Sequence, residues 1–455
     1  MTQKRVVIIF ALFWILGFSF PSAAQTSDDF FNGDILQEVR IYIAPRDFAT
    51  FKQTNFICPM QDLEALAGQV VSSLPRIECW FAVEFHWIFN GRDVTIPQVA
   101  VSSHGKGSRS NIKPSFKIEF SRYESQNNFL GLKDLVLRAN TQDASSMHEW
   151  LAMKLFRKLG IPAPREVHTR LYINDQYAGL YTIVEDVDLV FLQQNFGENE
   201  GRLYDYEWVD PWVFDYRGPD PSKYSPLPLK PENNLIHLDP APIEAMVRTI
   251  NQAPDAQFSA ALSQYIDLNA LFRELAAENF VADQDSIIGD YALNNFFLYR
   301  FQNRLESAFI PWDKSNAFWA IDWNIFHNLS TNVLTRRALA VAPDLIALYK
   351  DTLRQAANIA GGVGGWLEQE ITKEYQQIRQ AAYEDTRKLC DQGATGYLHP
   401  CSNDEFDAEV VYMLRFARER AGNVQTQLAP PPNERQDFRT GHNGAILHPY
   451  LWTVR

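Results

Sequence analysis

The chain has 455 residues, of which 46% are hydrophobic and 13% aromatic, so it can bury a large core. Its formal net charge of −13 argues against a nucleic-acid-binding surface, because such surfaces are basic. We therefore expect no nucleic acid among its partners.

The N-terminus predicts export from the cytosol. Two basic residues precede the apolar run Val6–Phe20, and Ser22 and Ala24 are small residues suited to a cleavage site. This pattern is typical of a secretory signal peptide over residues 1–24. An uncleaved membrane anchor is the alternative, but the run is shorter than the roughly 20 residues that span a bilayer. We expect a secreted, periplasmic or cell-surface protein with no transmembrane segment after signal cleavage.

The chain has four cysteines, Cys58, Cys79, Cys390 and Cys401, which suits an exported protein with disulfides. They form two close pairs along the sequence, so Cys58–Cys79 and Cys390–Cys401 is the simplest of three possible pairings. A zinc site is the weaker alternative, because no Cys-x-x-Cys spacing occurs.

Residues 25–200 are predicted to be rich in strands. Val39–Pro45 alternates between apolar and polar side chains, as a half-buried strand does. An Asn-Gly pair at residues 90–91 favours a tight hairpin turn. The expected hairpins pair Cys79–Phe89 with Asp93–Val101, and Arg170–Asp175 with Tyr177–Asp188.

A helix is expected between these two hairpins. Ser146 and Glu149 fit a capping box, in which two side chains satisfy backbone N–H groups at a helix start. Leu151 and Leu155 would lie on its buried face, and Gly160 would end it.

A glycine-containing basic turn follows the first hairpin. Gly105 and Gly107 stand beside Lys106 and Arg109, and the next predicted strand carries Lys117. Backbone N–H groups in such a turn can hold phosphate oxygens. The pattern does not match a Walker loop, and an ordinary flexible turn is the alternative.

The second half of the chain is predicted to be mostly helical. Residues 201–242 are rich in proline and aromatic residues and are expected to form an irregular connector. Residues 243–429 form the helix-rich region, and residues 430–455 an irregular tail. The expected helices are Ile243–Ile250, Leu268–Val281, Asp344–Ala360, Leu367–Cys390 and Asp404–Leu428.

The stretch most informative about function is a predicted hairpin formed by Phe296–Phe301 and Ser307–Trp312. Asp290 and Asn295 stand before its first strand, and Asp313 follows its second. Carboxylate and carboxamide oxygens suit hard divalent cations, and protein kinases use an Asp, an Asn five residues later and a second Asp in this way. Turn chemistry is the alternative explanation for both carboxylates.

Several segments together resemble the CotH family, a secreted and atypical protein-kinase-like family. They keep the order of the family's segments and span roughly residues 36–323. The matching segments are GKGSRSNIKPSFKIEF, FLGLKDLVLRAN, SSMHEWLAMKLFRKLGIP, RLYINDQYAGLYTIVEDVD, GDYALNNFFLYR and IPWD.

This resemblance implies an α+β, bilobal atypical protein-kinase-like fold with a strand-rich N-terminal lobe and a helix-rich C-terminal lobe. It also implies ATP with Mg²⁺ or Mn²⁺ as cofactors. The implied reaction is transfer of the γ-phosphate of ATP to Ser or Thr hydroxyls of exported protein substrates.

The resemblance also implies roles for individual residues. Asp290 would be the catalytic aspartate, although Asp285 competes for that role. Asn295 and Asp313 would hold the metal. The nucleotide-binding candidates are Lys117, Lys106, Arg109 and Glu185.

Two features depart from the family pattern. The family commonly has a second acidic residue two positions after the metal-binding aspartate, where this chain has Ser315, preceded by the cation Lys314. Asp322 could replace that acid only if the chain folds back. The segment SSHGKGS also stands in place of an arginine-rich turn. The alternative functions are therefore a non-catalytic pseudokinase that acts as a surface or structural binding protein, and a phosphoryl hydrolase.

Overall fold

The computed structural model describes residues 25–53, 79–105, 107–391 and 397–429. The predicted signal peptide, the tail, Cys58 and Lys106 lie outside the described residues. Within the described residues, no helix combines the length and the apolar character needed to cross a membrane.

Seven strands form a closed barrel in the order β1-β2-β3-β4-β5-β7-β6. β1 pairs in parallel with β6, and every other neighbouring pair is antiparallel. Alternate apolar side chains of these strands fill the barrel interior. The strands are β1 (Gln37–Ile43), β2 (Phe81–Phe89), β3 (Arg92–His104), β4 (Ser115–Glu119), β5 (Asp134–Arg138), β6 (Glu166–Ile173) and β7 (Gln176–Glu185).

Both hairpins predicted in this region are confirmed. Asn90 and Gly91 have φ angles of 50° and 75°, as a type I′ turn requires. Short helices α1 (Ser27–Phe30), α2 (Pro45–Gln53) and α4 (Leu189–Phe196) accompany the barrel.

Helix α3 (His148–Lys158) is present, but the predicted capping box is wrong. Ser146 has a positive φ of 61° and lies before the N-cap residue, Met147, which makes no side-chain capping bond. The carboxylate of Asp143 instead accepts a hydrogen bond of 2.6 Å from the backbone N–H of His148. Glu149 therefore does not cap the helix. Its side chain is buried instead.

A second sheet has the order β11-β10-β8-β9. The predicted hairpin at its centre is confirmed, as β10 (Phe296–Arg300) and β11 (Ser307–Pro311). The connector is less irregular than predicted, because β8 (Arg202–Tyr206) and β9 (Leu229–Pro231) arise within it. β8 pairs with the free edge of β10, which supplies hydrogen-bond partners that the local sequence does not reveal.

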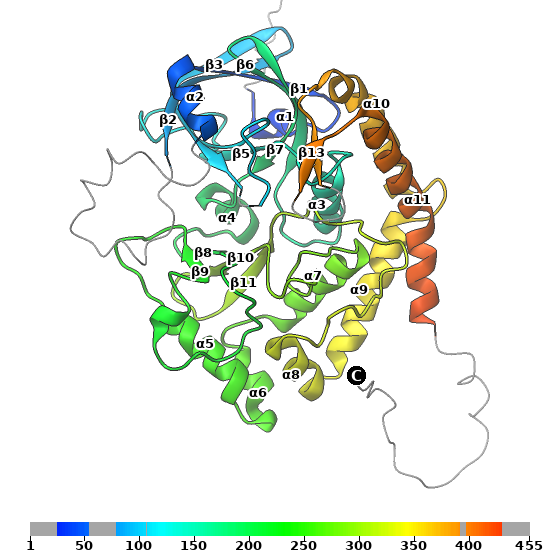
Figure 1. Cartoon of the computed structure of the whole chain (residues 1–455). Helices are drawn as coiled ribbons and strands as arrows, with labels where there is room; N and C mark the ends of the chain where they lie inside the picture. Colours follow the sequence, from blue (N-terminus) through cyan, green and yellow to red (C-terminus); the bar gives the residue numbers. More distant parts are fainter. Residues whose placement is uncertain (1–24, 54–78, 106, 392–396, 430–455) are drawn as a thin grey trace, which may run out of the picture.

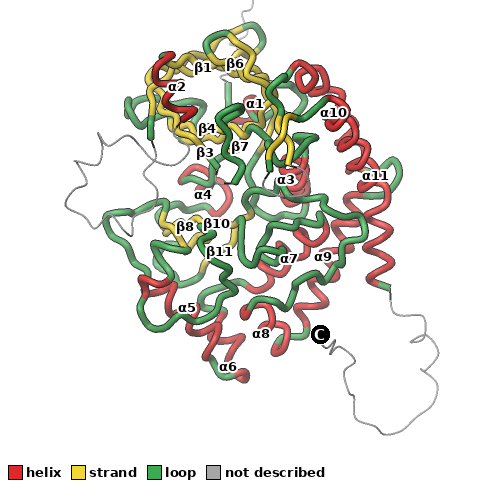
Figure 2. The backbone as a smooth tube through the Cα atoms, in the orientation of Figure 1, coloured by secondary structure: helices red, strands yellow, loops and turns green. Residues whose placement is uncertain are grey.

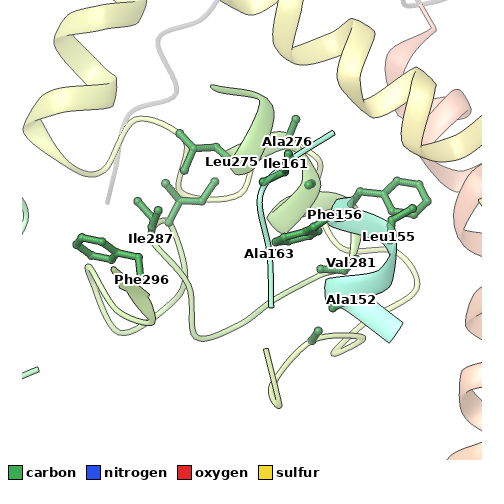
Figure 3. Packing of buried hydrophobic residues seen from close by; sticks show 14 of the residues in the cluster. Ala152, Leu155, Phe156, Ile161, Ala163, Leu275, Ala276, Val281, Ile287 and Phe296 are labelled. Carbon is green, nitrogen blue, oxygen red and sulfur yellow. The ribbon is translucent and has the colours of Figure 1, made fainter. Parts of the chain in front are cut away.

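The remaining helices enclose the largest hydrophobic cluster, which also contains the buried face of α3. Figure 3 shows part of this cluster, including Leu155 and Phe156 of α3 and Leu275 and Ala276 of the buried helix α7 (Leu268–Phe280). The helices are α5 (Ala241–Gln252), α6 (Asp255–Leu262), α7 (Leu268–Phe280), α8 (Val333–Val341), α9 (Asp344–Ala360), α10 (Trp366–Glu384) and α11 (Asn403–Leu428).

The predicted helix ending at Cys390 stops earlier, at Glu384. The chain then forms a small antiparallel pair, β12 (Leu389–Asp391) and β13 (Leu398–Pro400). The predicted Cys390–Cys401 disulfide joins the two sides of this pair. Cys79 is also disulfide-bonded, and its predicted partner lies outside the described residues.

Figure 1 shows the barrel at one end of the molecule and helices α5 to α9 toward the other, with α10 and α11 along one side. The tube view in Figure 2 shows the second sheet between the barrel and helices α5 and α6. The fold is therefore mixed α+β, as predicted.

Candidate active site

The two predicted metal-binding residues lie together because one hairpin places them. Asn295 immediately precedes β10 and Asp313 follows β11 after one residue, and Phe296 pairs with Pro311 across the hairpin. The backbone N–H of Trp312 donates to the Asn295 carbonyl oxygen at 3.1 Å. Asn295 and Asp313 also have positive φ angles, of 56° and 46°, a conformation concentrated at turns and functional sites.

The carboxylate of Asp313 is held at both oxygens. Nη1 of Arg138 lies 2.7 Å from Oδ2, and the Ser315 hydroxyl donates to Oδ1 at 2.8 Å. Burial alone would raise the pKa of Asp313, but the positive Arg138 guanidinium and the two hydrogen bonds hold it below its ordinary value. Asp313 is therefore ionised at neutral pH.

Arg138 is a central residue of this site that the sequence did not identify. It ends β5, and its Nε lies 2.8 Å from Oε2 of Glu149 on α3. Burial, opposed only in part by Arg138, raises the pKa of Glu149 to about 8. Burial also raises the pKa of nearby Glu166 well above its ordinary value. The guanidinium of Arg138 thus interacts with several carboxyl groups, and Asp313 is the one whose pKa stays below its ordinary value.

Lys314 does not add a positive charge to the site in the way that the sequence suggested. Its side chain is fully buried on the helical side, with Nζ 2.9 Å from Glu278 and 3.1 Å from Asp283. Burial would lower the pKa of Lys314, but these two carboxylates raise it above its ordinary value. Its charge is therefore neutralised within the core.

Asp285 lies close to the two predicted metal-binding residues. Its backbone carbonyl accepts a 2.8 Å hydrogen bond from Nδ2 of Asn295, and its carboxylate accepts one of 2.7 Å from Nδ2 of Asn294. Burial, together with the negative charges of Asp283 and Asp313, raises the pKa of Asp285 to about 6. Asp285 is thus a largely buried acid within electrostatic reach of Asp313.

Asp290 lies on the more exposed side of the same loop. Its Oδ1 is 2.6 Å from Nε2 of His327, and its Oδ2 accepts a 3.2 Å hydrogen bond from Gln284. Among the described residues, no hydrogen bond or ion pair joins Asp290 to Asn295 or Asp313. Its catalytic role stays a prediction.

Lys117 points outward from β4, on the face opposite the barrel core. Its Nζ lies 3.5 Å from Oδ2 of Asp186, directly after β7. Burial and the positive charges of Arg138 and Lys117 lower the pKa of His104 well below its ordinary value. Lys117, His104 and Arg138 therefore share one electrostatic environment at this face of the barrel.

The other predicted nucleotide-binding residues are less closely associated with the site. The carboxylate of Glu185 is engaged by Arg165, whose Nη2 lies 2.7 Å away. Arg109 donates to the backbone carbonyl of Gly105 and so closes the basic turn on itself. Their contact with a nucleotide stays a prediction, as does that of Lys106, which lies outside the described residues.

Asp322 does not take the place of the acid that Ser315 replaces. It is exposed, and within the described part of the chain its carboxylate makes no hydrogen bond or ion pair. Ser315 instead contacts Asp313 directly, and its carbonyl oxygen lies 3.1 Å from Nδ1 of His148.

Among the described residues, no group of three or more His, Cys, Asp or Glu side chains could hold a metal ion. The predicted pair Asn295 and Asp313 nevertheless offers donors of the chemical kind that a hard divalent cation takes. Asp313 supplies carboxylate oxygens, and Nδ2 of Asn295 is fixed by the backbone carbonyl of Asp285. Oδ1 of Asn295 accepts no hydrogen bond from the described residues, so it is open to a ligand. Oxygen ligands of this kind suit Mg²⁺ and Mn²⁺. The phosphate-binding role of Lys117 stays a prediction.

Comparisons with known proteins identify the family of the chain. A family model described as "CotH kinase protein" matches residues 101–424, which includes the helices after Trp323. Inner spore coat protein H of Bacillus subtilis (strain 168) is 25% identical over 340 residues, which cover 73% of this chain and 87% of that protein.

Two solved structures are also similar. The proinflammatory kinase CtkA of Helicobacter pylori has 9% identity and a TM-score of 0.25, over 69% of this chain and 94% of that chain. The HipA, HipB and operator DNA complex of Shewanella oneidensis MR-1 has 10% identity and a TM-score of 0.33, over 86% and 74% of the respective chains. At these scores neither likeness bears on function.

Proposed function

The chain belongs to the CotH kinase protein family, and from this we propose that it is an exported, metal-dependent protein kinase. It transfers the γ-phosphate of ATP to Ser or Thr hydroxyls of secreted or surface proteins. Its barrel and its helical part act as the two lobes of an atypical kinase, with the nucleotide between them. The spore-coat relative and the predicted signal peptide support a location outside the cytosol.

The observation that carries this proposal is the pairing of Asn295 and Asp313 at the open end of one hairpin, with Asp313 kept ionised by Arg138. Phosphoryl transfer spreads negative charge over the transferring group, so catalysis depends on positioned cations and on orientation. A divalent cation bound here would supply the charge that neutralises the phosphate oxygens. Asp313 and Asn295 would hold it, and Lys117 would bind phosphate.

The substrate hydroxyl needs a group that orients it and accepts its proton. The geometry favours Asp285, because it lies beside Asn295 and its pKa of about 6 makes it a better proton acceptor than an ordinary aspartate. Asp290 is the rival candidate, since it stands five residues before Asn295, as in other protein kinases. The proton would pass from the hydroxyl oxygen to a carboxylate oxygen of whichever residue faces the substrate.

A transfer assay tests this function. Purified protein is mixed with γ-labelled ATP, Mn²⁺ or Mg²⁺ and a casein-like acceptor, next to Asp313→Asn and the exposed control Asp322→Asn. We expect the wild type and Asp322→Asn to label the acceptor and Asp313→Asn to lose at least about 100-fold, as for loss of a principal electrostatic group. Absence of labelling by the wild type would reject the kinase, and release of free phosphate without labelling would indicate a hydrolase.

The second candidate is a non-catalytic pseudokinase that binds partner proteins. It is motivated by the connector, where large apolar side chains are solvent-exposed, with Ile236 at 91% and Leu235 at 63%. Exposed apolar groups that lie close together are typical of interaction surfaces. A wild type that neither binds metal-ATP nor transfers phosphate would favour this function.

A further inference from the structure

We propose that the candidate active site is built for one divalent cation, and that the guanidinium of Arg138 supplies the positive charge that a second cation would bring. This inference rests on the proposed function. Protein kinases commonly hold two Mg²⁺ ions with an Asp and an Asn in corresponding positions. How many cations this site takes is therefore a separate question from whether it transfers phosphate.

The two oxygens of Asp313 are not equivalent. Oδ2 is neutralised by Arg138, whose Nη1 lies 2.7 Å away. Oδ1 accepts a hydrogen bond of 2.8 Å from the neutral hydroxyl of Ser315, so a lone pair of Oδ1 stays available to a metal ion. A carboxylate that bridges two cations binds each of them through a different oxygen. In Asp313 only Oδ1 is available for a cation, because Oδ2 is bound to Arg138.

Arg138 is fixed in this position by more than its contact with Asp313. Its side chain is 9% exposed, its Nε lies 2.8 Å from Glu149, and its guanidinium lies 5.1 Å from the ring centre of Trp312. Arginine also stays protonated in proteins. The charge beside Oδ2 is therefore permanent and cannot easily move aside for a metal ion.

The neighbouring carboxylates already have other partners, so they are not available to bind a second cation. The carboxylate of Asp283 is 3.1 Å from the buried ammonium of Lys314. The carboxylate of Asp285 accepts a hydrogen bond of 2.7 Å from an asparagine side chain and lies beside the place proposed for the substrate hydroxyl. The residue two positions after Asp313 is Ser315, which carries no negative charge. A second cation would lack the carboxylates that bind it.

The test counts bound Mn²⁺ by electron paramagnetic resonance, which detects the free ion. Full-length mature protein is titrated with Mn²⁺ in the presence of an equal amount of AMP-PNP, a non-hydrolysable ATP analogue, and the nucleotide alone is the blank. We expect one Mn²⁺ per chain. Two per chain would overturn this inference and leave the proposed function standing, whereas none would overturn both.

Variants at two positions test the role given to Arg138. The Ser315→Asp variant adds a carboxylate but keeps Arg138, so it should still bind one Mn²⁺. The Arg138→Gln/Ser315→Asp double variant frees Oδ2 as well and should bind two. One ion in a folded double variant would contradict the role of Arg138. If the double variant does not fold, the Ser315→Asp variant alone tests the role of Arg138. Two bound Mn²⁺ ions in Ser315→Asp would show that Arg138 does not exclude a second cation.

Discussion

The charged side chains Asp313, Lys314 and Asp285 at the candidate active site have partners that fix their orientation and shift their pKa. Arg138 keeps Asp313 ionised, and Lys314 forms ion pairs with two buried carboxylates. Asp285 is held with a raised pKa by burial and by neighbouring negative charge. These contacts distinguish acids that are similar in sequence, and they lead to two predictions about single residues.

Asp285 and Asp290 can be separated by matched substitutions. We expect Asp285→Asn to lower phosphoryl transfer by about 100-fold or more, the range for loss of a general base. Asp290→Asn should stay within a few-fold of wild type, because its carboxylate contacts His327 and Gln284 rather than the metal-binding residues. The measurement is kcat/KM for ATP-dependent labelling of one acceptor. The reverse order would assign the catalytic role to Asp290.

His148 should make stability depend on pH. Burial would lower its pKa, but Asp143, Glu409 and the carbonyl of Ser315 raise it from 6.5 to about 9. The raised pKa means that its stabilisation is complete below pH 6.5 and is lost as pH rises through 9. At about 1.4 kcal/mol per pH unit, this amounts to about 3 kcal/mol across that window.

The measurement is the free energy of unfolding in urea on both sides of this pH window, for wild type and His148→Gln. In His148→Gln, the free energy of unfolding should not show the part of the decline with rising pH that His148 causes. An equal decline in both proteins would show that other buried acids cause it.

At the scale of elements, the hairpin β10–β11 could be predicted because its pattern is local. Two runs rich in apolar and aromatic residues on either side of a polar turn predict two strands. The ends of these strands then place Asn295 and Asp313 together. The Asn90-Gly91 turn and helix α9 were predictable for the same reason, since their own residues determine them.

Other parts of the site depend on contacts between distant segments and could not be predicted. In the sequence, Arg138 is only the last residue of an apolar strand. Its contact with Asp313, which lies 175 residues later in the chain, appears only in the folded structure. Glu149 fits a helix cap in sequence, but burial beside Arg138 gives it a different role. β8 pairs with the free edge of β10, and β9 pairs in turn with β8, which no local pattern reveals.

The β12–β13 pair is stabilised by one of the two disulfides. Cys390 and Cys401 are 11 residues apart, and closing a loop of that length restricts the unfolded chain enough to stabilise the fold by about 3 kcal/mol. We expect the Cys390→Ser/Cys401→Ser variant to unfold at a correspondingly lower urea concentration. The variant should be insensitive to a reducing agent at this site. An unchanged midpoint would show that the pair is held by its packing alone.

At the scale of the whole molecule, the site lies where the barrel meets the helical part. Asp313 follows the second sheet, Arg138 ends a barrel strand, and Glu149 belongs to α3, whose buried face lies in the helical core. A third hydrophobic cluster joins Val136 and Val184 of the barrel to Phe297 and Ile310 of the second sheet. The position of Asp313 is thus tied to how the two parts pack.

Binding of metal and nucleotide should therefore stabilise the whole molecule. At a concentration of metal-ATP 100 times its Kd, stability should increase by about 2.7 kcal/mol. The measurement is the thermal midpoint with Mn²⁺ and AMP-PNP together, with either one alone as the control. Asp313→Asn should lose this increase. An equal shift in Asp313→Asn would place the binding site elsewhere.

The measurement that tests the central claim most directly is which phosphate of ATP reaches which atom of an acceptor protein. Wild-type protein with Mn²⁺ is given either γ-labelled or α-labelled ATP, and the modified residue is identified by mass spectrometry. We predict label from the γ position alone, carried as a phosphoryl group on Ser or Thr hydroxyls, and its loss in Asp313→Asn. Transfer of the α label, or no transfer from either position, would contradict the account.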